Sequence, residues 1–179
     1  MTATNASGSG TATSAASATV SPAGSTFGVA TIGGTTTSGG AGYLDSSGPF
    51  TLPASGTISK LTAYLGAGAQ ATSLRAVVYA DDGTGKPGAL VGVSAEVTLA
   101  AGKSPGWVVF TLPSPVSAGA GKYWLGFWIG GAAGIYYYDS VAGSERYMPD
   151  PYSSSGTPNN PYGASSTSAS NYSIYATYG

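Results

Sequence analysis

The chain consists of short apolar and polar runs interrupted by frequent glycines and prolines, and this pattern limits the folds open to it. Among 179 residues there are 29 Gly and 11 Pro, and no segment has apolar residues recurring with a period of 3.6, so long helices are excluded. Short alternating runs between turn residues are typical of a sandwich or barrel of antiparallel strands. We therefore predict about nine or ten strands.

Two neighbouring segments show the alternation most clearly. In residues 57–66 and 73–82, every second side chain is apolar, which places one face of each strand against a core. Residues 122–131 are apolar on both faces, so we expect a central strand with Trp124 or Trp128 deeply buried. Further strands are predicted over residues 26–33, 42–47, 48–54, 89–100, 106–112, 134–140 and 172–178. The predicted core side chains of the first two segments are Leu61, Ala63, Leu65, Leu74, Ala76 and Val78.

The predicted turns depend on glycine and proline. Gly83 is expected to take a positive φ after Asp81 and Asp82, and Gly88 to take the left-handed position of a type II turn that begins with Pro87. Pro113 and Pro115 should end the strand over 106–112, because proline cannot donate to a ladder.

A long segment near the C-terminus has no strand pattern. Residues 150–170 are rich in Ser, Pro, Asn and Gly, which predicts an ordered loop. We expect its Tyr152, Pro161 and Tyr162 to pack on the sandwich.

The N-terminal residues differ in composition from the remainder. Residues 1–26 are almost entirely Thr, Ala, Ser and Gly and carry no charge, so we predict a low-complexity arm there and a β-sandwich domain over 27–179. The arm is either an inert linker or a segment that becomes ordered on a partner, where extended backbone could add to a sheet edge. The start has no basic region and no apolar region of a secretory signal. With Met1 as the natural start, we expect a protein that stays in the cytoplasm unless an assembly carries it out.

The charged residues give little support for catalysis. The chain has no His and no Cys, only 7% of its residues are charged, and the formal net charge is −1. Without His no Ser nucleophile has its usual base, and this charge predicts neither nucleic-acid nor membrane binding. We predict no enzyme, and no catalytic, cofactor or metal residues.

Three weaker alternatives remain open. Two of Asp139, Glu145 and Asp150 could form a glycosidase pair; otherwise they are exposed charges, with Arg146 as an ion-pair partner, whose removal alters stability little. Asp81 and Asp82 could bind Ca²⁺, or simply form a turn.

The third alternative concerns the aromatic residues of segments 122–131 and 134–140. An exposed row could stack on sugars or anchor a protein partner, with Trp128, Tyr136 and Tyr138 as the candidate contacts, or the rings could belong to the core. The whole stripe is Tyr123, Trp124, Phe127, Trp128, Tyr136, Tyr137 and Tyr138.

Several phrases of the sequence resemble a known module. TLPASGTISKLTAYL, LRAVVYADDGTGKPGALV, GWVVFTLPSPVSAGAGKYWLGFWIGG, YYYDSVAG and SIYATY look like a jelly-roll-like β-sandwich found in bacterial surface proteins and in structural proteins of tailed phages, particularly of actinobacteria. The resemblance covers about residues 27–179 and carries no catalytic motif. It implies an antiparallel two-sheet sandwich of jelly-roll-like topology.

The resemblance also implies a function. We expect a virion structural protein, most specifically a capsid decoration or accessory head protein. It would be assembled in the host cytoplasm, lie on the outer surface of the particle and be attached through its arm. Its partners would be the major capsid protein or other virion subunits, including its own copies. The alternative is a carbohydrate-binding or adhesin module of a bacterial surface protein, with a glycan as ligand.

Overall fold

The computed structural model describes residues 2–5, 8–11 and 24–179. Within these residues the chain is all-β, with antiparallel pairing throughout and no helix, which confirms the predicted fold class. Twelve strands form one hydrogen-bonded network, in the order β3-β14-β6-β12-β5-β11-β7-β8 with four more strands attached beside this path. Its strands are β3 (Ser25–Gly28), β4 (Thr35–Ser38), β5 (Tyr43–Leu52), β6 (Gly56–Ala67), β7 (Thr72–Asp81), β8 (Pro87–Val93), β9 (Val97–Leu99), β10 (Gly106–Ala118), β11 (Gly121–Ile129), β12 (Gly134–Pro149), β13 (Ser166–Tyr172) and β14 (Ile174–Tyr178).

The N-terminal region contains a separate two-stranded pairing. β1 (Thr2–Asn5) pairs antiparallel with β2 (Gly8–Thr11) as a short hairpin. Most of the predicted arm, namely residues 1, 6–7 and 12–23, lies outside the described residues. Ser25 and Thr26, the last described residues of the predicted arm, pair with β14.

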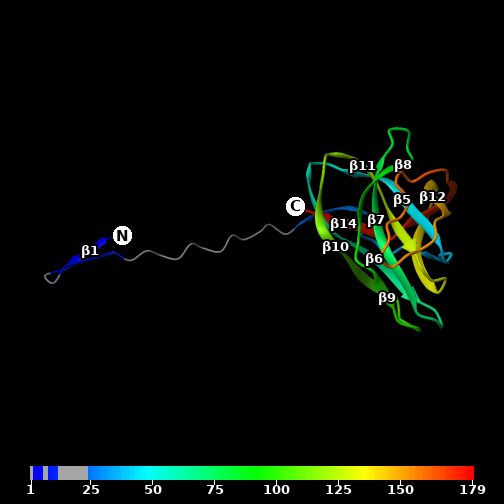
Figure 1. Cartoon of the computed structure of the whole chain (residues 1–179), viewed down its shortest axis with the longest axis horizontal. Helices are drawn as coiled ribbons and strands as arrows, with labels where there is room; N and C mark the ends of the chain where they lie inside the picture. The colour runs from blue at the N-terminus through cyan, green and yellow to red at the C-terminus, as the bar shows by residue number, and fades with distance from the viewer. Residues whose placement is uncertain (1, 6–7, 12–23) are drawn as a thin grey trace.

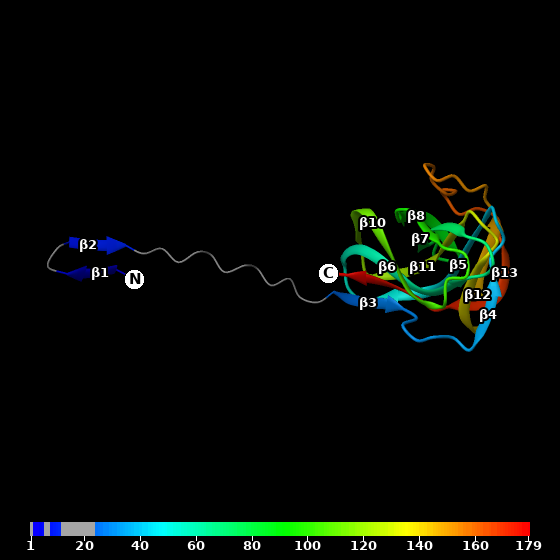
Figure 2. The same ribbon diagram turned by 90° about the horizontal axis from the view of Figure 1, so that it is seen from below.

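The network bends so that two groups of strands face each other (Figures 1 and 2). One group contains β10, β6, β14 and β3, and the other contains β5, β11, β7 and β8. β12 joins the groups: its first residues pair with β6 and β4, and its last residues pair with β5. This arrangement is a sandwich in which one strand runs from one layer into the other. Its jelly-roll connectivity stays a prediction.

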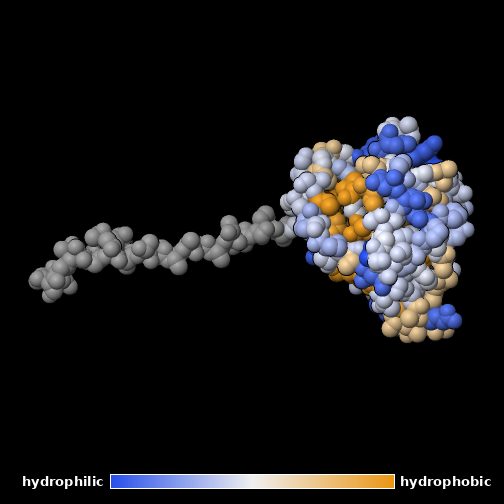
Figure 3. Space-filling view, viewed as in Figure 1, coloured by the Kyte–Doolittle hydropathy of each residue, from blue (hydrophilic) through white to orange (hydrophobic). Residues whose placement is uncertain are grey.

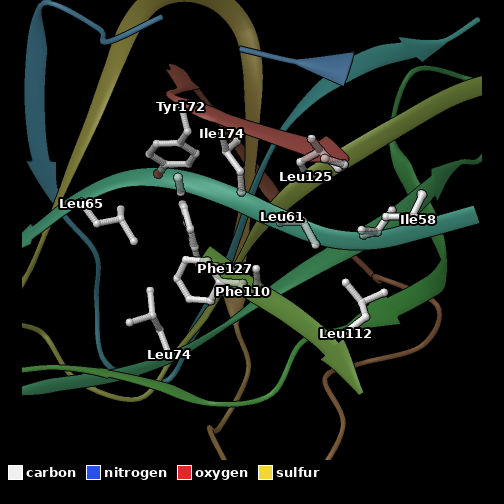
Figure 4. Close-up of a cluster of buried hydrophobic side chains, with 14 of the residues drawn as sticks. Ile58, Leu61, Leu65, Leu74, Phe110, Leu112, Leu125, Phe127, Tyr172 and Ile174 are labelled. Carbon is white, nitrogen blue, oxygen red and sulfur yellow. The ribbon is translucent and has the colours of Figure 1, made fainter. Parts of the chain in front are cut away.

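The hydrophobic core lies between the two groups of strands (Figure 4). The six side chains predicted to face it are at most 1% exposed and belong to one buried cluster, which confirms the alternation. From the facing layer, Leu125 and Phe127 of β11 point into the same cluster. Burying one such side chain stabilises the fold by about 1.5–3 kcal/mol, so this cluster is the main source of stability.

The opposite face of β11 forms a second, smaller core. Trp124 and Trp128 are both buried there beside Val77 and Tyr79, so the prediction of deep burial holds for both tryptophans. The segment after β12 covers this face, because Tyr162 is part of the cluster and Tyr152 packs against it. The packing predicted for Tyr152 and Tyr162 is therefore confirmed.

Other details of the predicted C-terminal loop are wrong. Pro161 is exposed, whereas Pro158 is buried. The loop also ends earlier than residue 170, because β13 begins at Ser166 and pairs along β12. β13 was not predicted, because its Ser and Thr residues give no apolar alternation. It is a strand because its backbone pairs with β12.

Two proline predictions are also wrong. Pro113 and Pro115 do not end β10; they lie where its register with β6 shifts, between Thr111 and Val116, and the strand then resumes. An irregularity of this kind accommodates residues that cannot donate to the ladder.

The glycine predictions for the turn after β7 are confirmed only in part. Gly88 has no positive φ and lies within β8. Gly83 and Gly85 provide the left-handed positions, so only the prediction for Gly83 is confirmed.

The close approach of β11 to β5 requires glycine at position 126. A Cβ there would lie 2.0 Å from the Asp45 carbonyl oxygen and 2.5 Å from Ser46 Cα, and neither backbone atom can move without shifting β5. We predict that Gly126→Ala lowers the free energy of unfolding by about 2 kcal/mol or more in urea denaturation. Gly119→Ala is the matched control, because a Cβ at Gly119 meets nothing within 4 Å. Equal stability of the two variants would contradict this packing.

Candidate functional site

A pocket of about 400 Å³ opens where β12 leaves one layer and joins the other. It is walled by β4, β5, β12 and β13, and we call it the β5–β12 pocket. Its lining combines two carboxylates, four tyrosines and several hydroxyl groups, with no Lys or Arg among them. The lining residues are Thr37, Ser38, Gly40, Tyr43, Asp45, Tyr138, Glu145, Tyr147, Ser168, Ser170 and Tyr172.

Strand pairing places the two carboxylates on the same side of the sheet. Asp45 of β5 pairs with Tyr147 of β12, and Glu145 lies two residues before Tyr147. Side chains two residues apart on a strand share a face, so Glu145 is the diagonal neighbour of Asp45. The register of β12 with β13 shifts between Ser140 and Glu145, and the intervening Gly143 has φ +73°. This irregularity lies immediately before the position of Glu145.

Both carboxylates are largely withdrawn from solvent. Asp45 is 7% exposed and Glu145 is 6% exposed. Burial, together with the neighbouring charge of Glu145, raises the pKa of Asp45 from its usual 3.8 to about 7. The Tyr172 hydroxyl donates a hydrogen bond to Glu145 Oε1 at 2.5 Å. The pKa of Tyr172 is raised well above its usual range, mainly by burial and also by the negative charges of Asp45 and Glu145. The pocket thus holds two carboxylates near each other, each largely shielded from solvent by the surrounding protein.

The three acidic residues considered from the sequence are not brought together. Asp139 is exposed and accepts a hydrogen bond from Gly34 N at 3.0 Å, while buried Asp150 accepts one from Asn159 N at 2.8 Å. Glu145 instead meets Asp45, a hundred positions earlier in the chain. The interpretation of these acids as exposed charges is therefore wrong for Glu145 and Asp150, and it holds only for Asp139. Arg146, predicted as their ion-pair partner, has a buried Nε that finds no hydrogen-bond partner among the described residues.

The aromatic candidates divide between core and pocket. Trp128 and Tyr136 are each 1% exposed; Trp128 donates its indole N–H to the Asp150 carbonyl, and Tyr136 packs on Phe127. Both side chains are covered by the chain itself, so they present no free surface to a ligand. Tyr138 lines the β5–β12 pocket and packs edge-on against Tyr172.

A different set of rings lies on the outer face of the layer that contains β10, β6, β14 and β3, where Trp107 is exposed and the other three rings are half-buried. Tyr137, Tyr64, Trp107 and Tyr175 come from β12, β6, β10 and β14, and we call them the outer aromatic cluster. Their ring centroids follow one another at 5.0, 5.4 and 5.5 Å, in edge-to-face orientations. Trp107 is 40% exposed, and Val109 next to it on the same face of β10 is 50% exposed.

The remaining surface is weakly charged. Figure 3 shows a hydrophobic area on the near face, on the side of the sandwich where β10 lies, and several separate hydrophilic groups over the rest of that face. Of the outer aromatic cluster, only Tyr137 was among the predicted aromatic residues, as a member of the longer stripe. The missing signal was long-range pairing: Trp107 lies directly opposite Tyr64, more than forty residues away.

The two carboxylates of the turn at the end of β7 accept hydrogen bonds from nearby protein donors. Asp81 Oδ1 accepts from Gly83 N and Gly85 N, while its Oδ2 accepts from Trp124 Nε1. Asp82 Oδ1 accepts from the Thr84 amide and hydroxyl, and these bonds lower the pKa of Asp82. The two carboxylates therefore form the predicted turn. In the described part of the chain no group of three or more His, Cys, Asp or Glu residues could hold a metal ion.

Comparison with known proteins gives no match: no protein-family model, no curated protein and no solved structure is detectably similar to the chain. Among the described residues there is no helix that is long and apolar enough to cross a membrane.

The raised pKa of Asp45 predicts a pH-dependent stability. In the unfolded chain Asp45 ionises above pH 3.8, whereas in the folded chain it keeps its proton until about pH 7. The folded state therefore binds more protons between these values, and stability falls as the pH rises through this window, by up to about 4 kcal/mol. Asp45→Asn should remove this loss and be more stable than the wild type at pH 8, but not at pH 4.

Urea denaturation at both pH values measures this difference. Asp139→Asn is the matched control, because Asp139 is exposed on β12 outside the pocket. If Asp45→Asn and the wild type change in parallel between pH 4 and pH 8, the carboxyl is not destabilised by burial as described.

Proposed function

We propose that this chain is a non-catalytic structural protein of a tailed-phage particle, most specifically a capsid decoration or accessory head protein. It lies on the outer surface of the virion and is assembled in the host cytoplasm. Its partners are the major capsid protein or other virion subunits, together with copies of itself. The phage setting rests on the sequence resemblance, and the subunit contact rests on the surface chemistry described above.

The outer aromatic cluster carries the proposed contact. Centres of protein interfaces are enriched in Trp and Tyr and depleted of charge. The four rings and Val109 form such a surface on four adjacent strands, with Trp107 40% exposed. A subunit that covered Trp107 and Val109 would remove apolar area from water at about 25 cal/mol per Å².

The N-terminal arm is the second proposed attachment element. Residues 1–26 contain no charged side chain, so attachment through them is insensitive to salt. Ordering such a segment costs about 1–2 kcal/mol per residue in backbone entropy, which a partner surface has to offset. Backbone hydrogen bonds and contacts of small side chains are the interactions available to these residues.

The alternative function is a carbohydrate-binding or adhesin module of a bacterial surface protein. The observation behind this alternative is the β5–β12 pocket, because tyrosine rings, hydroxyls and carboxylates are groups that can contact sugars. The alternative predicts binding to a cell-wall or surface glycan and no binding to capsids.

Attachment to particles tests the proposal. Virus-like particles are assembled from a major capsid protein encoded in the same genome, without this protein, and purified wild-type protein is added. Cosedimentation should give saturable binding that is unchanged between low and high salt. Trp107→Ala should weaken binding at least about tenfold, as for a central aromatic contact. Val141→Ala is the matched control, because Val141 is 47% exposed outside the cluster.

A truncation separates the two attachment elements. Deletion of residues 2–23 keeps Ser25 and Thr26, which pair with β14, so the sandwich should stay folded by circular dichroism. If this variant decorates particles like the wild type, the arm is only a linker. If the wild type binds no particle but binds isolated glycans, the alternative function replaces the proposed one.

Absence of catalysis is part of the proposal and is tested separately. A screen of glycoside and ester substrates should give no turnover above buffer, because the chain contains no His and we assign no acid–base role to Asp45 and Glu145. Turnover that Asp45→Asn or Glu145→Gln abolishes, and that Asp139→Asn leaves intact, would establish a hydrolase and overturn this part.

A further inference from the structure

The β5–β12 pocket contains a carboxyl group without a partner. Asp45 is 93% buried, as its 7% exposure shows, and it lines the pocket. Glu145 accepts a hydrogen bond from the Tyr172 hydroxyl, whereas no hydrogen bond to the Asp45 carboxyl is found among the described residues. A carboxyl that is largely buried and lacks both a protein donor and a counter-ion is only partly compensated for its lost hydration, and a ligand in the pocket can supply what is missing.

We propose that this pocket binds a small organic cation through its primary ammonium group, which donates hydrogen bonds to Asp45 and Glu145. The proposal is independent of the particle contact, because the pocket and the outer aromatic cluster share no residue. The ammonium would supply both a positive charge and N–H donors to the two carboxylates. Charge-assisted hydrogen bonds of this kind are about twice as strong as neutral ones.

The walls of the pocket suit an organic stem better than a bare metal ion. Four tyrosines, Tyr43, Tyr138, Tyr147 and Tyr172, surround the acids and can contact CH₂ groups. A calcium ion takes six to eight oxygen ligands, with several carboxylates among them. The pocket offers two carboxylates, and no third acidic residue lines it.

Lack of a positive side chain at the site favours a cation over a neutral sugar. The titratable groups around Asp45 come from four segments of the chain. β12 contributes Glu145, Tyr136, Tyr138 and Tyr147, β13 contributes Tyr172, β5 contributes Tyr43, and the segment after β12 contributes Tyr162. Each of these is acidic or neutral. A neutral sugar would leave the mutual repulsion of the two carboxylates unchanged, whereas an ammonium reduces it.

Cation binding is therefore linked to loss of the Asp45 proton. With a pKa of about 7, Asp45 is mostly protonated at pH 6 and mostly ionised at pH 8. An alkylammonium, with a pKa near that of lysine, stays charged across this range. The affinity should rise about tenfold from pH 6 to pH 8.

The experiment titrates the full chain with n-butylamine at pH 6, 7 and 8, followed by two-dimensional NMR of the backbone amides. 1-Butanol has a similar stem without the charge, tetramethylammonium has the charge without N–H donors, and glucose is a neutral sugar. We expect butylamine to shift the amides of residues 43–47, 145–147 and 168–172 in a saturable manner. The other three probes should bind at least tenfold more weakly.

Variants keep the proposal falsifiable if binding is weak. Asp45→Asn and Glu145→Gln preserve side-chain shape and should each weaken butylamine binding about tenfold or more at pH 8. Asp139→Asn should bind like the wild type. Circular dichroism and the amide spectrum verify that each variant is folded, and Asp45→Asn should also abolish the pH dependence.

Four outcomes would overturn the proposal. These are no saturable shift with butylamine, equal binding of glucose or 1-butanol, equal binding of tetramethylammonium, or undiminished binding in both Asp45→Asn and Glu145→Gln. Equal binding of glucose would identify a neutral glycan site instead. None of these outcomes affects the particle-binding test, because that test measures a different surface.

Discussion

Strand β11 is buried on both of its faces, and the arrangement of its neighbours depends on this burial. Leu125 and Phe127 fill the core between the layers, so the opposite layer has to cover them. Trp124 and Trp128 project from the other face, where the segment after β12 has to cover them through Tyr162. Gly126 allows β5 to approach this strand closely. A strand that is apolar on both faces has to lie centrally in the fold. Its second face is covered by the irregular segment after β12, not by another strand.

β12 passes from one layer of the sandwich to the other. This strand pairs with β6 in one layer and then with β5 in the other, and its register with β13 shifts between Ser140 and Glu145. At the crossing, side chains from both layers meet around a space that the core does not fill, and Asp45 and Glu145 line it. The cost of burying two acids there falls on the stability of the fold. Groups held in this way are typical of functional sites, where a ligand compensates for the cost.

Local patterns predicted the parts of the fold that local physics controls. Alternation of apolar and polar residues identified the core faces around Leu61 and Leu74. The apolar residues on both faces of segment 122–131 identified β11 as a central strand. Polar β13 was missed because its strand character comes from pairing with β12. The site was mostly missed for the same reason: Asp45 and Glu145, like Tyr64 and Trp107, meet only through strand register, which the sequence does not encode locally. Of the residues that line the β5–β12 pocket, only Glu145 and Tyr138 were predicted as site candidates. Each was predicted together with residues that the fold places elsewhere.

Among the described residues, the fold buries Asp45 and Glu145 together in a pocket whose lining contains no Lys or Arg. The most direct measurement is the titration of the Asp45 side-chain carboxyl by ¹³C NMR, in the wild type and in Glu145→Gln. The account predicts a midpoint of about 7 in the wild type and a lower midpoint in the variant, because burial remains but the neighbouring charge is removed. A wild-type midpoint near 4, unchanged by Glu145→Gln, would show that Asp45 is solvated or already paired and would contradict the account.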